Sequence, residues 1–229
     1  AVILQGSGSL CWAGGMRNSW REALKGNYDA YLLLNDDTNV FSNVFNELLS
    51  AHDYCRKQYG RTGIYLGSTY DASTKQISYG GAKLTNKFLF KYHFLTPNGQ
   101  FQHCELGNAN IMLVPREVVN DIGILSEGYT HGVADYDYTL KAVKKNIPVL
   151  ITPEYSGTCT DDHADMYATF PEKSFSERLA LLKNPLALDF KSNFNLMLRH
   201  FPLRVPFVLL SAGLKLILPS FYVKGLRNR

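Results

Sequence analysis

Apolar residues along this chain fall into short continuous runs that polar segments separate. The run Ala30–Leu34 is apolar at every position, which is typical of a strand buried on both faces. Comparable runs at 1–4, 62–68, 108–114 and 147–152 predict further strands. Segments 16–25, 40–59 and 135–145 lie between them and have helical character. This alternation predicts an α/β fold with a mainly parallel sheet flanked by helices.

The remaining segments set the expected boundaries. Pro115 fits the first position of a short helix that stops at Gly123. Residues 70–105 are polar and aromatic, and no element is assigned to them. From about Phe175 the pattern is helical throughout. We therefore expect an α/β domain over residues 1–170 and a C-terminal helical region over residues 171–229.

The composition is that of a soluble globular protein, with 45% hydrophobic and 19% charged residues. None of the four cysteines forms a C-x-x-C pair, so a zinc site or a redox motif is not expected. The sequence shows no signal-peptide pattern. These features favour free thiols in a reducing compartment and a cytoplasmic location, with two disulfides as the alternative.

Charge is distributed unevenly along the chain. Seven basic residues and no acidic ones follow from Phe190 onward, so the net charge of +4 leaves −3 on residues 1–189. A basic, apolar terminal segment on an acidic body indicates contact with a membrane surface rather than with nucleic acid.

The tail alternates apolar stretches with isolated basic residues over 194–218. Its longest apolar run, Val205 to Leu214, is well short of the roughly 20 residues needed to span a bilayer. One interpretation is peripheral membrane contact through residues 190–229, at the inner face of the plasma membrane. The other is that these helices cover the sheet or form a homodimer interface.

The segment YLLLNDDTNVF places Asp36 and Asp37 directly after the buried run. Ligands of open α/β sheets bind just outside the carboxyl ends of the strands. Two adjacent carboxylates there repel each other unless a cation neutralises them, and Mg²⁺ or Mn²⁺ prefers such oxygen ligands. The alternative is a turn and helix cap, where aspartate is favoured.

A second acidic position, Asp135, begins the helix at 135–145. The helix dipole keeps a carboxylate there ionised, and in a cleft it can accept a proton from a hydroxyl nucleophile. The alternative is an N-cap accompanied by an ion pair between Asp137 and Lys141.

Two weaker signals complete the set of candidates. The glycine-rich segment Gly6–Asn18 is a plausible diphosphate site, with Arg17 and Asn18 opening the following helix, or it is an ordinary turn. His163 follows the strand at 147–152 and is either a ligand of a metal at Asp37 or a hydrogen-bonded surface residue.

Four segments, in this order, resemble glycosyltransferase family 2 with its GT-A fold, especially the bacterial rhamnosyltransferase-like members. WAGGMRN is similar to the family's glycine-rich segment before the donor-site helix, and LLLNDDT is similar to its metal motif. GNANIMLVPREVVNDIGILSEGY and ADYDYTLKAVKKNIPVLITP resemble the acceptor-side strand and helix and the segment that bears the catalytic base. The resemblance covers about residues 1–165.

The resemblance implies a role for each candidate. Asp37 is implied as a metal ligand and Asp36 as a nucleotide contact. Asp135 is implied as the general base, and His163 as a contact to the metal or the diphosphate. Gly15, Arg17 and Asn18 fall in the implied nucleotide-sugar site.

The implied activity is that of an inverting hexosyltransferase, with rhamnosyltransferase as the more specific class, and it depends on Mg²⁺ or Mn²⁺. It would move a sugar from a nucleotide-sugar donor to a glycan or a lipid-linked acceptor in cell-surface polysaccharide synthesis. Two other functions stay open: a metal-dependent nucleotidyltransferase, for which no activating Lys or Arg loop is evident, and an inactive carbohydrate-binding remnant.

The chain departs from the family pattern at three points. Family members begin with a strand and helix that hold much of the nucleobase site, and we expect this chain to lack them. Asn35 replaces the first carboxylate of the commonest metal motif, and Ala134 replaces the acidic residue that usually precedes the base.

Overall fold

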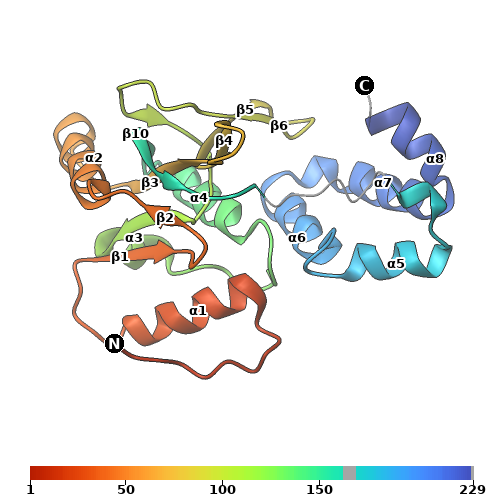
Figure 1. Cartoon of the computed structure of the whole chain (residues 1–229), viewed down its shortest axis with the longest axis horizontal. Coiled ribbons are helices and arrows are strands. Elements are labelled where there is room, and N and C mark those ends of the chain that lie inside the picture. The colour runs from red at the N-terminus through yellow and green to blue at the C-terminus, as the bar shows by residue number, and fades with distance from the viewer. Residues whose placement is uncertain (162–168, 228–229) are drawn as a thin grey trace. The chain divides into compact units, whose positions relative to one another are not determined.

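The computed structural model describes residues 1–161 and 169–227, which form two compact units. Unit 1 comprises residues 1–4, 15–126 and 135–161, and unit 2 comprises residues 5–14, 127–134 and the chain after residue 161. Unit 1 holds the strands and unit 2 holds the C-terminal helices (Figure 1).

The main sheet of unit 1 is mixed. In the described residues its order is β1-β9-β3-β10-β2, while β4 pairs with β3 and β7 with β10. The β3–β10 pairing is parallel, and the pairings of β1 with β9, β9 with β3, and β10 with β2 are antiparallel. The strands are β1 (Ala30–Leu34), β2 (Asn39–Val40), β3 (Ile64–Tyr70), β4 (Ile77–Tyr79), β7 (Gln102–His103), β9 (Ile111–Pro115) and β10 (Val149–Thr158).

An α/β fold is therefore confirmed, but the expectation of a mainly parallel sheet was wrong. Parallel neighbours need a long crossover, usually a helix. Between β3 and β9 the chain instead forms short strands, so that β9 enters the sheet antiparallel to β3.

The unassigned segment 70–105 supplies most of a second, three-stranded sheet with the order β6-β5-β8. Strands β5 (Gly81–Asn86) and β6 (Lys91–Phe94) form an antiparallel hairpin, and β8 is Leu106–Gly107. The four residues between β5 and β6 form the hairpin turn, in which the Asn86 side chain accepts a hydrogen bond from Leu89 N at 2.8 Å.

Residues 1–4 do not form the expected strand. They are exposed, and the side chain of Ile3 is 95% accessible. In the described part of the chain β1 pairs only with β9, and residues 1–4 make no ladder with it. An apolar run becomes a strand only where a partner takes up its backbone N–H and C=O groups.

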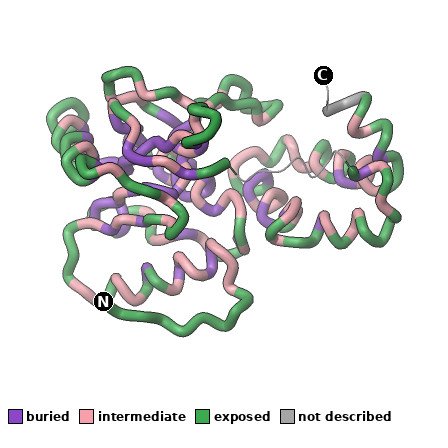
Figure 2. The backbone as a smooth tube through the Cα atoms, viewed as in Figure 1, coloured by how far each residue is buried: buried purple, intermediate pink, exposed green. Residues whose placement is uncertain are grey.

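Helix α2 (Val44–Tyr59) covers one face of the main sheet. Its buried residues recur at helical spacing and pack against Tyr65, Ile111 and Leu150. The helix ends at Gly60, whose φ of 66° suits a residue without a Cβ. Figure 2 shows the buried positions of unit 1 concentrated on the central strands.

Helices α1 (Cys11–Ala23) and α4 (Ala134–Lys144) supply aromatic side chains to unit 1 away from α2. The Trp20 ring lies 6.1 Å from that of Tyr31 and 5.3 Å from that of Tyr138, measured between centroids. Helix α3 (Arg116–Ile122) ends at Gly123 as the sequence predicted, but it begins one residue later than expected, because Pro115 is its extended N-cap and not its first helical residue. All four cysteines are free thiols, also as expected.

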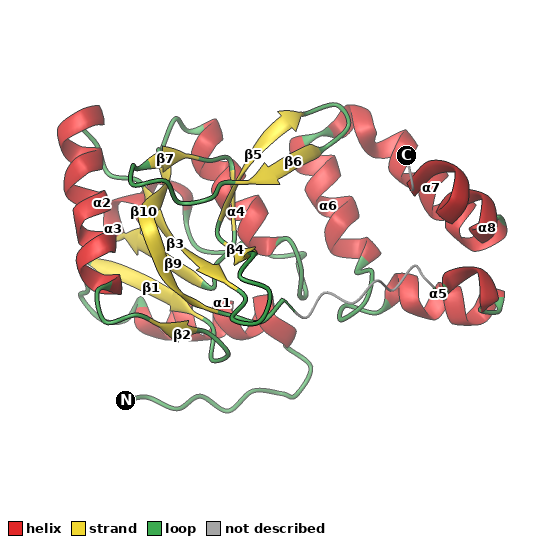
Figure 3. Ribbon diagram, turned by 45° about the horizontal axis from the view of Figure 1, so that its top comes forward, coloured by secondary structure: helices red, strands yellow, loops and turns green. Residues whose placement is uncertain are grey.

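Unit 2 is helical, as the pattern beyond Phe175 predicted. Its main helices are α5 (Phe175–Lys183), α6 (Phe190–His200), α7 (Val205–Ile217) and α8 (Pro219–Phe221), with shorter helical segments at Phe170–Glu172, Pro202–Arg204 and Tyr222–Arg227 (Figure 3). A capping box between Ser174 and Glu177 begins α5. Within the described residues no helix is both long enough and apolar enough to cross a membrane.

Candidate active site

The two adjacent aspartates lie in an exposed turn directly after β1. Strand β1 ends at Leu34, and Thr38 N donates to Asn35 O at 3.3 Å to close the turn. Asp36 and Asp37 are both exposed. The prediction that both aspartates lie at a strand's carboxyl end is therefore confirmed, and Asp37 Oδ1 accepts a hydrogen bond from the Thr38 hydroxyl at 3.4 Å.

The start of β9 holds this turn in place. Asn35 N donates to Asn110 O at 3.2 Å, and the buried Asn110 side chain donates to the Cys159 thiol at 3.6 Å. Burial raises the pKa of Cys159, and the nearby Asp37 carboxylate adds to the rise. The turn formed by residues 35–38, called the aspartate turn below, thus meets the start of β9 and the end of β10. All three lie at the end of the sheet where β1 and β10 have their carboxyl ends.

Asp135 lies in the first turn of α4 and contacts the connection between β8 and β9. Its Oδ2 accepts hydrogen bonds from Asn108 Nδ2 at 3.5 Å and from Ala109 N at 3.3 Å, and its Oδ1 accepts one from Tyr136 N at 2.8 Å. The Asn108–Asn110 segment, defined as these three residues, therefore contacts Asp135 at one end and the aspartate turn at the other.

The surroundings of Asp135 set its proton affinity. Burial raises the pKa of this carboxyl to about 6, although its three hydrogen bonds act in the opposite direction. The group is therefore ionised at neutral pH and has a higher proton affinity than an exposed aspartate. Both properties suit a general base.

A third carboxylate organises the end of β3. Asp71 is almost fully buried and accepts hydrogen bonds from Ser73 N at 2.8 Å and Thr74 N at 2.9 Å. Hydrogen bonds hold the pKa of Asp71 well below the usual range, and the bond from the Ser73 hydroxyl has the largest effect. Its other oxygen accepts Asp161 N at 3.1 Å, which fixes the chain after β10 at this same edge.

His163, predicted to contact the metal or diphosphate, lies outside the described residues. Asp161, the last described residue before it, donates its backbone N–H to Asp71 Oδ2. Among the residues that the structure describes, no group of three or more His, Cys, Asp or Glu side chains gathers as a metal site. The exposed carboxylates of the aspartate turn are suitable Mg²⁺ or Mn²⁺ ligands, and Mg²⁺ characteristically takes its remaining ligands from phosphates and water.

The glycine-rich segment differs from its prediction. Helix α1 begins at Cys11, so Gly15 lies inside the helix and not in the preceding turn, and Arg17 and Asn18 lie inside the helix instead of opening it. Arg17 is buried and its Nη1 donates to Ser126 O at 3.1 Å. A role for these three residues in donor binding stays a prediction.

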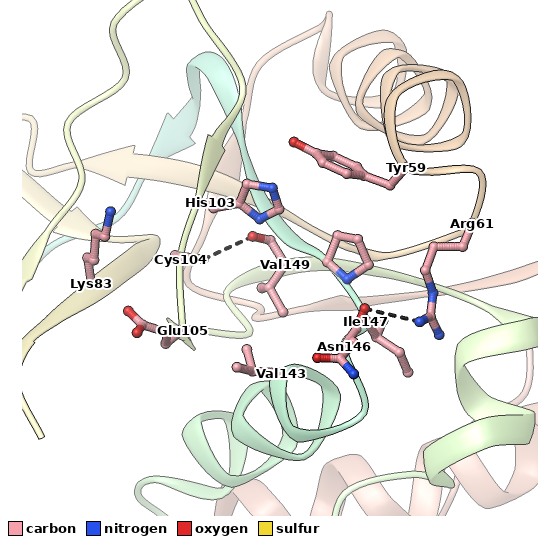
Figure 4. Close-up of a pocket in the computed structure, with 11 residues that line it drawn as sticks. Tyr59, Arg61, Lys83, His103, Cys104, Glu105, Val143, Asn146, Ile147 and Val149 are labelled. Atoms are coloured by element: carbon pink, nitrogen blue, oxygen red, sulfur yellow. Dashed lines mark hydrogen bonds between the residues drawn. The ribbon is translucent and has the colours of Figure 1, made fainter.

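A hollow of about 610 Å³ lies at the opposite, amino-terminal ends of β3 and β10. Figure 4 shows Tyr59, His103, Lys83 and Arg61 around it, with Arg61 hydrogen-bonded to Asn146 O at 3.1 Å. Burial, helped by Lys83, lowers the pKa of His103. Among the predicted site residues that the structure describes, none lines this hollow.

Sequence analysis missed the residues that join the predicted site. Asn108 and Asn110 stand out only as asparagines flanking the start of a strand, and Ala109 acts through its backbone N–H. Asp71 gave a clearer signal, because an aspartate followed two residues later by serine, after a strand, is typical of a side-chain-closed turn.

No protein-family model matches the chain, and no curated protein matches it. The case for a function therefore rests on the geometry at the carboxyl ends of the strands.

Proposed function

We propose that the protein is an inverting, metal-dependent glycosyltransferase that uses a nucleotide-sugar donor and a hydroxyl acceptor. One observation carries the proposal: the Asn108–Asn110 segment contacts both the aspartate turn and Asp135. The exposed carboxylates of Asp36 and Asp37 and a carboxylate with raised proton affinity thus lie at the same end of the sheet.

In this proposal the exposed Asp37 carboxylate binds Mg²⁺ or Mn²⁺ and Asp36 contacts the nucleotide. The cation, when bound, supplies positive charge that stabilises the leaving diphosphate. Asn35 and Thr38 keep the turn closed, so that both carboxylates face solvent at the strand end.

Asp135 takes the proton of the acceptor hydroxyl. The acceptor oxygen then forms a bond to the anomeric carbon as the bond from that carbon to the diphosphate breaks, and a single displacement of this kind inverts the anomeric configuration. Hydrogen bonds from Asn108 and Ala109 to Oδ2 hold the carboxylate in place, and Oδ1 accepts a hydrogen bond from Tyr136 N.

The acceptor is proposed to be a glycan or a lipid-linked sugar, and the C-terminal tail is proposed to contact a membrane. Helix α7 exposes Phe207, Leu209 and Leu210, each more than half accessible, and contains no acidic residue. Such a segment suits the interface between acyl chains and headgroups.

The test is calorimetric titration of the protein with a panel of nucleoside diphosphates, with and without Mn²⁺. We expect at least one of them to bind only when the cation is present, because the clustered carboxylates otherwise repel the diphosphate. The corresponding nucleoside monophosphates serve as controls and should show a weaker dependence on the cation. Equal affinity with and without Mn²⁺ across the whole panel would contradict the proposal.

A further inference from the structure

The β5–β6 hairpin exposes an apolar tip. The tip, defined as residues 87–90, is the turn KFLF, in which Phe88 is 55% and Leu89 is 50% accessible. The turn is well defined: Asn86 Oδ1 accepts Leu89 N at 2.8 Å, and Thr85 Oγ1 donates to Lys91 O at 3.1 Å. Figure 2 shows the exposed positions of this hairpin in green.

Positive charge surrounds these apolar side chains. Lys87 is the first residue of the tip and Lys91 follows it directly, and segment 81–94 contains three lysines and no acidic residue. One acidic side chain, Glu105, approaches Lys87 from outside the hairpin at 4.0 Å, but the Lys87 side chain is still 70% accessible. Exposed apolar side chains beside lysines are the arrangement that an anionic lipid surface accepts.

A row of aromatic rings connects the tip to the candidate active site. The rings of Phe90 and Tyr92 lie 5.7 Å apart between centroids, and Tyr92 lies 5.9 Å from Tyr136. Tyr136 follows Asp135 directly in α4. The hairpin thus runs from an exposed apolar end to the residue next to the proposed base.

We propose that the tip of the β5–β6 hairpin docks on an anionic membrane, with Phe88 and Leu89 among the acyl chains and Lys87 and Lys91 among the headgroups. The aromatic row then leads from the bilayer surface to Asp135, where a lipid-linked acceptor presents its hydroxyl. This use of the aromatic row rests on the proposed glycosyltransferase function. Docking of the tip is a separate property, measured without any donor.

The test is site-specific fluorescence on the full chain. Leu89→Cys is made in a Cys11→Ser background, because Cys11 is part-exposed whereas Cys55, Cys104 and Cys159 are buried. The new thiol carries an environment-sensitive fluorophore. With vesicles containing phosphatidylglycerol, the emission should shift to the blue, and lipids with brominated acyl chains should quench it. Vesicles of phosphatidylcholine alone should have much less effect.

The matched control is Phe45→Cys in the same background. Phe45 is 62% accessible on α2, a helix with two acidic and two basic residues, so it offers apolar exposure without net charge. Its label should not respond to either vesicle. A label at position 89 that stays silent while the protein co-sediments with anionic vesicles overturns the proposal, because binding then occurs elsewhere.

The lysines give a second measurement. Lys87→Gln/Lys91→Gln should weaken the response at position 89 to anionic vesicles by roughly fivefold for each lysine removed. An unchanged response would overturn the electrostatic part of the proposal. Sedimentation of the unlabelled protein without lipid decides the remaining alternative: if Leu89→Ser dissociates an oligomer, the tip is a protein interface and the membrane proposal is wrong.

The two proposals fail separately. If the protein binds a nucleoside diphosphate only with the metal, and the label at position 89 does not respond to lipid, the proposed glycosyltransferase function survives and tip docking is excluded. A lipid response at position 89 without any nucleotide binding would retain tip docking and remove the role of the aromatic row in delivering an acceptor.

Discussion

Asp135→Asn is expected to lower kcat for sugar transfer by about 10²- to 10⁴-fold, the usual contribution of a positioned general base. The asparagine side chain has nearly the same shape but cannot take up the acceptor's proton. Because a base acts mainly in the transition state, the affinity for the nucleotide should change little. Transfer kinetics and nucleotide titration, performed on the same preparation, measure the two effects.

The pH dependence provides the control for this role. The carboxyl of Asp135 must be ionised to accept a proton, and burial raises its pKa to about 6. The ionised fraction grows as pH rises through that value, so kcat/KM for the proposed transfer should fall below about pH 6 in the wild-type protein. The residual activity of Asp135→Asn should not show this fall in kcat/KM at low pH. Full activity in the variant would assign the base to another residue.

Asp37→Ala is expected to remove most of the dependence of nucleotide binding on Mg²⁺ or Mn²⁺. The side chain is exposed at the end of β1, so its loss would remove the proposed ligand without leaving a core cavity. Removing even an indirect partner of a metal typically costs about 10- to 100-fold in affinity, and a direct ligand should cost at least as much. Calorimetry at several Mn²⁺ concentrations measures the change.

Asp53→Ala is the matched control for that experiment. Asp53 is an exposed aspartate on α2, outside the aspartate turn and the Asn108–Asn110 segment. Its replacement changes the net charge by the same amount and should leave metal-dependent binding intact. If both variants weaken binding equally, the effect is one of overall charge, and Asp37 is not a ligand.

The elements that sequence analysis predicted well are those whose signals are local. The run Ala30–Leu34 has the bounds of β1, because five consecutive apolar residues end at a polar turn. Pro115 and Gly123 bound α3 for reasons of backbone conformation, and the region from Phe175 is helical as expected. These features depend on neighbours in sequence, which a single chain displays.

The features that could not be predicted depend on distant partners. Strand direction in the sheet is set by how β9 returns after the short strands that follow β3. The hairpin turn has Phe90 at a φ of 50°, a conformation uncommon for an aromatic residue and therefore absent from turn rules. The Asn108–Asn110 segment acts partly through a backbone carbonyl of Asn110 and the N–H of Ala109, which carry no sequence signal.

The most direct test of a shared metal site is paramagnetic broadening of side-chain amide signals in NMR spectra. Asn108 donates to Asp135, and Asn110 donates to Cys159 beside Asp37, so their amides report on the two halves of the proposed site. Asn146 lies at the opposite end of the sheet and serves as the reference. Adding Mn²⁺ with a nucleoside diphosphate should broaden the Asn108 and Asn110 signals and spare that of Asn146. Broadening at Asn146 alone, or at none of the three, would contradict a metal–nucleotide site between Asp37 and Asp135.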